Sequence, residues 1–382
     1  MRILWLSSAP WTPTHYGNQT ALFTRELRAA GHDLTIVGTS GISRGQVEWH
    51  GIPVLPMPLS MTIDSALIVK HYEHCRADLI ISLHHLQDTV DGSALRKERP
   101  DILWGLWFPI DCEPLPHSFY PILNASSFRL TLSRFGERVA GDAGFSIRYI
   151  PYGINTTIFQ PRCRAQARKE LEWPADVFIS GMVAKNSGVS PAFQQNISGF
   201  ARFHRKHPDS LLYLHTIAIS EDGLNLESVC TREGLKIGKD VFFCDPYRHF
   251  IGIPATEMVS IYNAIDVLQM ASMGDGFGLP LIEAQSCGTP VITGDWSATS
   301  ELCFSGWKVT KQESKTWCQP PGGKWRLPSP DAIADRLEQA YITGKDVKRM
   351  AQMREPARQG ALAHDVKTVV AQYWLPLLAE IA

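Results

Sequence analysis

Apolar residues recur along the chain in a pattern that predicts alternating strands and helices. Residues 2–8 and 33–39 are short apolar runs typical of buried strands. Between them, residues 18–32 place apolar side chains at helical spacing and end in Gly31, a common helix stop. Further runs of the same kind follow at 51–57, 77–83, 101–108, 128–133 and 148–153. Strands of this type separated by helices indicate a parallel sheet that is covered on both faces.

A second alternation of the same kind begins at residue 178 and continues to the end of the glycine-rich stretch near 302. Residues 155–175 are polar and contain several prolines, which is typical of a linker. We therefore predict two α/β domains, each a doubly wound parallel sheet, over 1–160 and 170–360. Residues 311–328 contain Pro-Pro-Gly-Gly and are predicted to form an irregular loop. A helix is expected to restart with Ser329 as its N-cap.

Charge and cysteine content restrict the classes of function. The 37 basic and 38 acidic residues leave a net charge of −1, which does not favour a general polyanion binder. Eight cysteines are scattered without a CxxC pair, so zinc and redox motifs have no support and no metal site is predicted. No apolar stretch reaches the length of a membrane helix, and the first apolar run is too short for a signal peptide. The expected location is the cytoplasm.

The stretch 272–279, "SMGDGFGL", joins a predicted strand to a predicted helix and carries three glycines. Glycines let backbone N–H groups approach a ligand, and the N-terminus of a helix attracts an anion, for which a diphosphate is the natural guest. Glu283 lies about one turn inside the helix, where it can accept two hydrogen bonds from a ribose diol. Asp275, at the tip of the loop, can accept hydrogen bonds from sugar hydroxyls beyond the phosphates.

The whole stretch from Ser272 to Leu302 resembles the nucleotide-sugar site of retaining GT-B glycosyltransferases of the family 4 type. That family has two acids separated by seven residues, usually both Glu, with "GFGLP" between them and "EAxxCGTPVI" after them. Here Asp275 stands where the first Glu is usual, which shortens its reach by one methylene. The resemblance extends over almost the whole chain, including "WFPIDCEPLP" at 107–116 and "YWLPLLAEI" near the C-terminus. It implies two Rossmann-like domains facing a cleft, with a helix at about 362–382 returning to the first domain.

The resemblance also assigns site residues. It implies that the donor is bound by Gly276, Phe277, Gly278, Leu279 and Glu283. It also implies that the glycine loop after the first strand approaches the donor phosphates and the acceptor. This loop contains Gly17 and Asn18, which are expected to precede a helix that starts near Gln19. The family usually has an Arg and a Lys after the strand that resembles "GMVA". Here Lys185 is present and the second basic residue is missing, with Arg134 and Arg248 as possible substitutes.

Four polar residues in the first half are candidates for either a functional or a structural role. Asp111 follows a predicted strand at its carboxyl end, where it either contacts the transferred sugar or the acceptor, or forms an Asx-turn in a proline-rich loop. Glu113 is expected to be structural. His84 and His85 end another strand; without nearby acids or cysteines they are expected to be histidines without chemistry rather than metal ligands.

These observations predict a metal-independent retaining glycosyltransferase without a cofactor, with Asp275, Asp111 and Lys185 in catalytic roles. The chain has no Asp-x-Asp sequence to hold a divalent ion on the diphosphate. The donor is expected to be a nucleoside diphosphate hexose, with UDP-glucose favoured over GDP-mannose. The acceptor is a glycan, a small molecule or, less favoured, a modified DNA base. A catalytically weak nucleotide-sugar-binding protein is the alternative, and the oligomeric state is open. A dehydrogenase is disfavoured because no GxGxxG follows the first strand.

Overall fold

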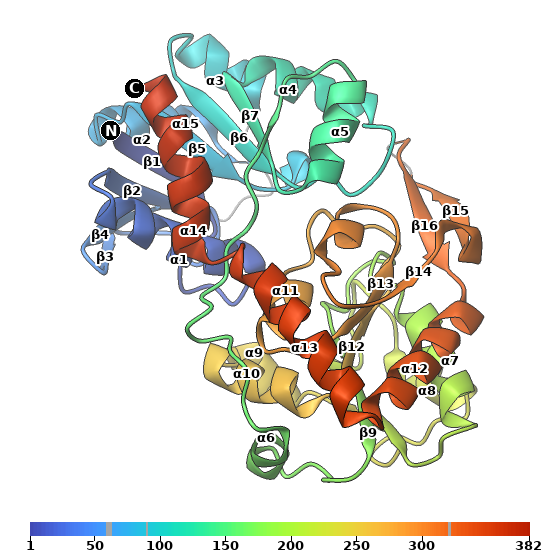
Figure 1. Cartoon of the computed structure of the whole chain (residues 1–382). Coiled ribbons are helices and arrows are strands. Elements are labelled where there is room, and N and C mark those ends of the chain that lie inside the picture. Colours follow the sequence, from blue (N-terminus) through green and yellow to red (C-terminus); the bar gives the residue numbers. More distant parts are fainter. Residues whose placement is uncertain (59–62, 89–90, 320–321) are drawn as a thin grey trace. The chain divides into compact units, whose positions relative to one another are not determined.

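The computed structural model describes residues 1–58, 63–88, 91–319 and 322–382, and the chain divides into two compact units (Figure 1). The first unit comprises 1–153, 322–323 and 365–382, and the second comprises 154–319 and 324–364. The first unit therefore ends at Gly153 rather than at 160. Among the described residues, no helix combines the length and apolarity that a membrane crossing requires.

The first unit is built on an eight-stranded sheet. Its strands are β1 (Arg2–Ser7), β2 (Asp33–Gly38), β3 (Val47–Trp49), β4 (Ile52–Pro56), β5 (Leu79–Leu83), β6 (Trp104–Phe108), β7 (Phe128–Thr131) and β8 (Arg148–Tyr149). They lie in the order β3-β4-β2-β1-β5-β6-β7-β8, and every neighbouring pair is parallel except the β3–β4 pair at the edge.

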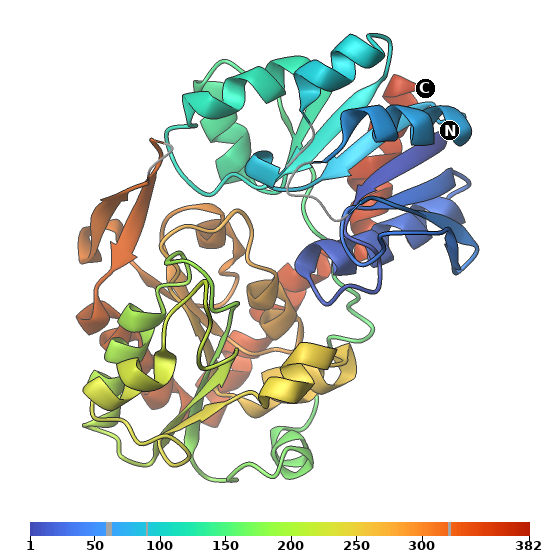
Figure 2. The same cartoon turned by 180° about the vertical axis from the view of Figure 1, so that it is seen from behind.

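The helices of the first unit are α1 (His15–Ala29), α2 (Ser65–His74), α3 (Gly92–Glu98), α4 (Tyr120–Ala125), α5 (Arg134–Asp142), α14 (Val366–Val369) and α15 (Leu375–Ile381), with a π-helical turn at Val370–Trp374 and 3₁₀ turns at Leu86–Asp88 and His117–Phe119. Helices α2, α3 and α4 pack in succession, as the view of Figure 2 also shows. Helix α1 contacts α14 and the π-helical turn that follows it.

An aromatic cluster fixes the C-terminal helix to the first sheet. Trp374 is fully buried, with its ring centroid 5.7 Å from Trp5 of β1 and 5.1 Å from Trp107 of β6. Phe23 of α1 completes the cluster at 5.1 Å from Trp107. Burial of such large side chains contributes about 1.5–3 kcal/mol each, which ties the last helix to the first unit. That helix begins at Val366 rather than 362, because α13 (Val347–Leu362) precedes it.

The second unit has a six-stranded parallel sheet. Its strands are β9 (Phe178–Val183), β10 (Ser210–His215), β11 (Val241–Phe243), β12 (Val267–Met270), β13 (Val291–Gly294) and β14 (Gly306–Val309), in the order β11-β10-β9-β12-β13-β14. The helices are α6 (Arg164–Glu170), α7 (Phe193–His204), α8 (Leu226–Arg232), α9 (Pro246–Ile251), α10 (Ala255–Ala264), α11 (Leu279–Ser286), α12 (Pro330–Gly344) and α13, with 3₁₀ turns at Ala298–Leu302 and Lys311–Glu313. Helix α7 packs against α8 and α12, and α11 packs between α10 and α13.

In both sheets the strand order reverses at one position. The chain moves outward from β1 through β2 to β4 and then returns to place β5 on the other side of β1. In the second sheet it moves from β9 to β11 and returns to place β12 beside β9. Open α/β sheets bind their ligands at such a switch point, outside the carboxyl ends of the two strands. The fold therefore directs the search in the second unit to the segments that follow β9 and β12.

Two sequence predictions about local structure were wrong. Residues 155–175 are not a free linker, because α6 packs on α10 and Arg168 donates hydrogen bonds to the carbonyl of Ala264 and to Asp266. Residues 311–328 are not an irregular loop, because β15 (Ser314–Cys318) pairs antiparallel with β16 (Lys324–Pro328). Ser329 is the N-cap of α12, as predicted, although its side chain makes no capping hydrogen bond.

Candidate donor-binding site

The glycine-rich loop leaves β12 at the switch point and enters α11. Gly278 is the N-cap of this helix and adopts φ 112°, a conformation that strains other residues. No side chain caps the helix among the described residues, and Pro280 lies in its first turn. Gly278 has no side chain to cap this helix, and the N–H of Leu281 donates to the carbonyl of Gly278 (2.9 Å). The partial positive charge of the helix N-terminus favours an anion in front of Leu279. Gly276, Phe277, Gly278 and Leu279 all belong to this segment, as predicted.

Hydrogen bonds hold the loop in place against its neighbours. The backbone N–H of Met273 donates to the carbonyl of Ser190 (2.7 Å), in the segment that follows β9. The indole of Trp296 donates to the carbonyl of Ser272 (3.0 Å). The amide of Asn196 donates to the carbonyl of Ala271 (3.1 Å). The segments after β9, β12 and β13 therefore form one connected rim. Because these segments are held in place before a ligand binds, binding does not carry the free-energy cost of ordering them.

Asp275 lies in this loop with a partly buried side chain. Its Oδ1 accepts a hydrogen bond from the backbone N–H of Phe277 (3.2 Å). This contact orients the carboxylate within the loop, in the manner of an Asx-turn.

Glu283 lies one turn into α11 and has an unusual environment. Its Oε2 accepts a hydrogen bond from the hydroxyl of Tyr262 on α10 (2.7 Å), and Tyr262 is fully buried. Burial raises the pKa of Glu283 to about 7, although the hydrogen bond from Tyr262 opposes the shift. A fixed carboxylate of this kind is suited to accept hydrogen bonds from a diol. Tyr262 is a site residue that the sequence analysis missed.

Because the pKa of Glu283 is raised, the ionised side chain lowers the stability of the folded state at neutral pH. In the folded state the pKa of Glu283 is about 7, whereas its ordinary value is 4.5. Between pH 4.5 and pH 7 the folded state therefore binds a proton that the unfolded state has released. The stability of the folded state falls as the pH rises through this window. We expect Glu283→Gln, which keeps an acceptor for Tyr262, to increase the free energy of unfolding at pH 8 by about 1–3 kcal/mol. Most of that gain should vanish at pH 5. Urea unfolding at both pH values measures it.

The matched control for this prediction is Glu221→Gln, because Glu221 is exposed in a turn of the same unit. We expect this control to leave the free energy of unfolding within about 0.5 kcal/mol of the parent at both pH values. An equal gain for Glu283→Gln at pH 5 and pH 8 would contradict the assignment of the shifted pKa.

Lys185 follows β9, the strand beside β12, and its side chain is exposed. The next residue, Asn186, is buried and makes side-chain hydrogen bonds to the backbone of Ile217 and Leu224. This anchor holds the segment that carries Lys185 at the carboxyl edge of the sheet. Lys185 and the glycine-rich loop therefore leave adjacent strands at the switch point. Arg248, which the sequence suggested as a further cation, is paired with Glu257.

In the first unit, the predicted helix boundary was wrong. Gly17 and Asn18 do not precede the helix, because α1 begins at His15 and Thr14 is its N-cap, accepting a hydrogen bond from the N–H of Gly17 (3.0 Å). Only glycine fits at position 17, because the backbone of Thr12 lies so close that a Cβ at this position would clash with the Thr12 carbonyl oxygen. Asn18 is exposed in the first turn of α1.

The remaining predicted residues follow strands of the first sheet. Asp111 lies beyond β6 with a partly buried side chain, and its charge adds to burial in raising the pKa of the Cys112 thiol. Glu113 forms an exposed ion pair with Arg138 (2.6 Å), which fits the structural role expected from the sequence. His84 follows β5 and is buried, and burial lowers its pKa to about 4, so it is neutral at physiological pH. His85 is exposed, and Arg134 pairs with Glu137 (2.7 Å).

Comparison with known proteins shows similarity to glycosyltransferases. Residues 225–341 match the sequence profile described as "Glycosyl transferases group 1". A D-inositol 3-phosphate glycosyltransferase of Arthrobacter sp. strain FB24 is 27% identical over 162 residues, which cover 41% of this chain and 35% of that protein. The chain resembles the group 1 glycosyltransferases over this part of its length. It spans about a third of the length of the curated relatives it matches.

Solved structures show that the similarity in fold extends over the whole chain. Sucrose-phosphate synthase of Thermosynechococcus elongatus superposes with a TM-score of 0.77 at 17% identity, covering 99% of both chains. HepE of Anabaena, in complex with UDP-glucose, superposes with a TM-score of 0.75 at 17% identity, covering 99% of this chain and 100% of HepE. The GT-B fold, with two parallel-sheet α/β domains, is thereby confirmed.

Proposed function

We propose that this chain is a retaining hexosyltransferase that moves a sugar from a nucleoside diphosphate to an acceptor hydroxyl. One observation carries the proposal: a helix N-terminus whose N-cap is glycine, a glycine-rich loop and the Tyr262-oriented carboxylate of Glu283 meet at the switch point of the second sheet. The helix N-terminus suits the diphosphate, and Glu283 suits the ribose diol. UDP-glucose is our preferred donor, with GDP-mannose second, and the UDP-glucose in the HepE structure supports this order.

The proposed reaction needs no metal at the diphosphate. The bond between C1 and the diphosphate oxygen breaks, the acceptor oxygen bonds to C1 on the same face, and the acceptor proton passes to a diphosphate oxygen. Lys185 and the N-terminus of α11 stabilise the negative charge that develops on the leaving group. Asp275 accepts hydrogen bonds from hydroxyls of the transferred sugar, and Asp111 contacts the sugar or orients the acceptor. The names of the curated relatives suggest a phosphorylated polyol as the first acceptor to test.

Calorimetry with UDP, GDP and their glucose and mannose derivatives tests the donor site. We expect Glu283→Ala to weaken binding of the preferred nucleotide at least tenfold, equivalent to about 1.4 kcal/mol, because the ribose loses its acceptor. Glu221→Ala, in an exposed turn of the same unit, is the matched control and should bind like the parent. Unchanged affinity in Glu283→Ala would remove this residue from the ribose role, and tighter binding of GDP would overturn the choice of UDP.

Turnover by the purified chain separates a transferase from a protein that only binds nucleotide sugars. We expect release of the nucleoside diphosphate from the bound donor to be faster with an acceptor than without one. Tight donor binding with no release under either condition would favour the binding protein.

A further inference from the structure

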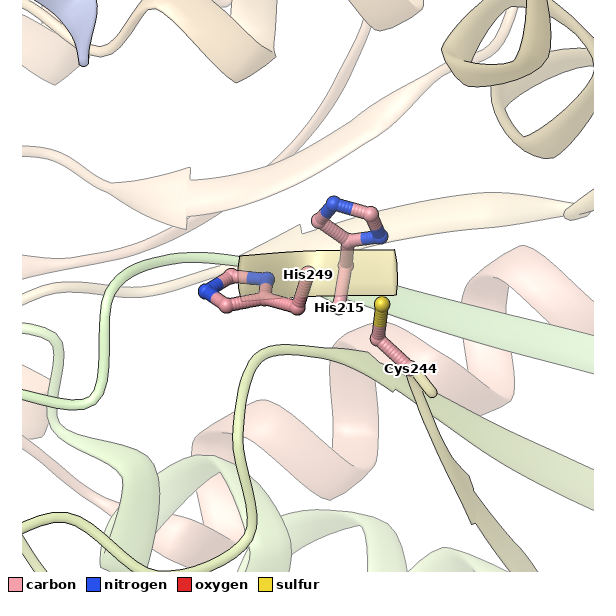
Figure 3. Close-up of side chains that lie close together, drawn as sticks. All are labelled: His215, Cys244 and His249. Carbon is pink, nitrogen blue, oxygen red and sulfur yellow. The ribbon is translucent and has the colours of Figure 1, made fainter. Parts of the chain in front are cut away.

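A cluster of nitrogen and sulfur side chains lies at the carboxyl edge of the second sheet, outside the donor loop. His215 is the last residue of β10, Cys244 directly follows β11, and His249 belongs to α9 (Figure 3). One ligand atom from each of the three residues lies within 4.8 Å of the other two. The sequence analysis missed this cluster because its members come from three separate elements and form no spacing motif.

Backbone contacts fix the three elements relative to one another. β10 and β11 are neighbouring parallel strands, and the N–H of Cys244 donates to the carbonyl of Leu214 (3.0 Å). Asp245 caps α9 by accepting from the N–H of Arg248 (2.8 Å), and its carbonyl accepts from the N–H of His249 (2.9 Å). The backbone at the ends of β10 and β11 and at the N-terminus of α9 therefore brings the two imidazoles and the thiol together.

The thiol of Cys244 donates a hydrogen bond to the carbonyl of Asp245 (3.5 Å). Tyr213 provides an outer contact to His215, because its hydroxyl lies 2.9 Å from Nδ1 of that residue. Partners of this kind orient histidine ligands in metal sites and set which ring nitrogen is available.

The cluster combines a buried thiol with two histidines that solvent can reach, so an ion from solvent has access to it. Cys244 is 4% exposed, whereas both histidines are partly exposed.

We propose that His215, Cys244 and His249 form a binding site for a zinc ion. Imidazole nitrogen and thiolate sulfur are the ligands that zinc prefers, and three protein ligands leave the fourth tetrahedral position for water. Binding converts the Cys244 thiol to a zinc-bound thiolate and releases its proton to solvent. This zinc site is distinct from the proposed diphosphate site at Lys185 and α11, where no metal is needed. The zinc proposal does not rest on the proposed transferase activity.

Competition between the metal-free full chain and a chromophoric zinc chelator tests the site. We expect one zinc ion per chain, bound with a dissociation constant below about 1 µM, and at least about 100-fold weaker binding in Cys244→Ser and in His249→Ala. Tyr213→Phe should weaken binding about tenfold, because His215 loses its outer partner. Cys163→Ser is the matched control, since Cys163 is an exposed thiol outside the cluster, and it should bind like the parent.

Cobalt substitution supplies a readout that does not depend on affinity. The parent chain with Co²⁺ should show an absorption band from thiolate-to-metal charge transfer, and Cys244→Ser should abolish it while the far-ultraviolet circular dichroism stays unchanged. Zinc affinity in the parent equal to that of the Cys244→Ser and His249→Ala variants would overturn the proposal. A charge-transfer band that survives Cys244→Ser but disappears in Cys163→Ser would overturn it as well.

Discussion

Replacement of Lys185 by alanine is expected to lower kcat/KM for transfer by about 100- to 1,000-fold, the usual effect of removing one group that stabilises charge in a transition state. The diphosphate gains negative charge as the bond to C1 breaks, and Lys185 is the cation that follows the strand beside the donor loop. Since the usual second basic residue is missing after this strand, little in the same segment can replace the lost charge. Initial-rate kinetics with the donor identified by calorimetry measures the effect.

The control for this prediction is Lys206→Ala. Lys206 is also exposed, but it precedes β10 at the amino edge of the same sheet, away from the segments that follow the strands. We expect its kcat/KM to remain within about twofold of the parent. If Lys185→Ala also stayed within a few-fold of the parent, the leaving-group charge would have to be balanced elsewhere, and Lys185 would lose its catalytic assignment.

Gly17→Ala is expected to destabilise the first unit by about 2–4 kcal/mol, within the range measured for severe overpacking and strain. The new Cβ would clash with the carbonyl oxygen of Thr12 and lie 2.9 Å from that of Ala9, and neither backbone atom can move away without displacing the loop before α1. The hydroxyl of Thr12 would clash as well, but a side chain can rotate. Thermal and urea unfolding measure the loss, and the shape of the loop before α1 should change with it.

The same substitution at Gly141 provides the comparison. Gly141 lies in α5 of the same unit and is exposed, and a Cβ added there would meet no atom of another element within 4 Å among the described residues. Because alanine is the better helix former, Gly141→Ala should raise the free energy of unfolding by up to about 1 kcal/mol. Equal effects at the two glycines would show that helix propensity, rather than the close approach at Gly17, controls the response.

The sequence predicted most of the strands and the glycine-rich connection from β12 to α11 well, because both depend on residues that are close together in the chain. Parallel strands are buried on both faces, so β1, β5 and β12 appear as continuous apolar runs. Asp275 and Glu283 are separated by a single loop and one helical turn, so their spacing alone places them at one end of α11. The GT-B fold followed from the two alternations and from the resemblance to the family.

Features that depend on contacts between distant residues could not be predicted. Tyr262 belongs to α10, and only packing of α10 against α11 brings its hydroxyl to Glu283. Residues 155–175 contain prolines typical of a linker, yet Arg168 finds its partners about a hundred residues later in the chain. The strands β15 and β16 are short, with β15 largely exposed and β16 mostly only partly buried, so neither appears as a buried apolar run in the sequence. The Pro-Pro-Gly-Gly sequence therefore led to the prediction of an irregular loop. The start of α1 was misplaced because Gly17 resembles a loop glycine, whereas it is needed for a close approach inside the first helical turn.

The position of the diphosphate in a crystal of the chain grown with UDP tests the central claim most directly. The account predicts phosphate oxygens within hydrogen-bond distance of backbone N–H groups between Gly276 and Leu279, with the ribose hydroxyls on the carboxylate of Glu283. A diphosphate bound away from the segments that follow β9 and β12, or a ribose turned away from Glu283, would contradict it.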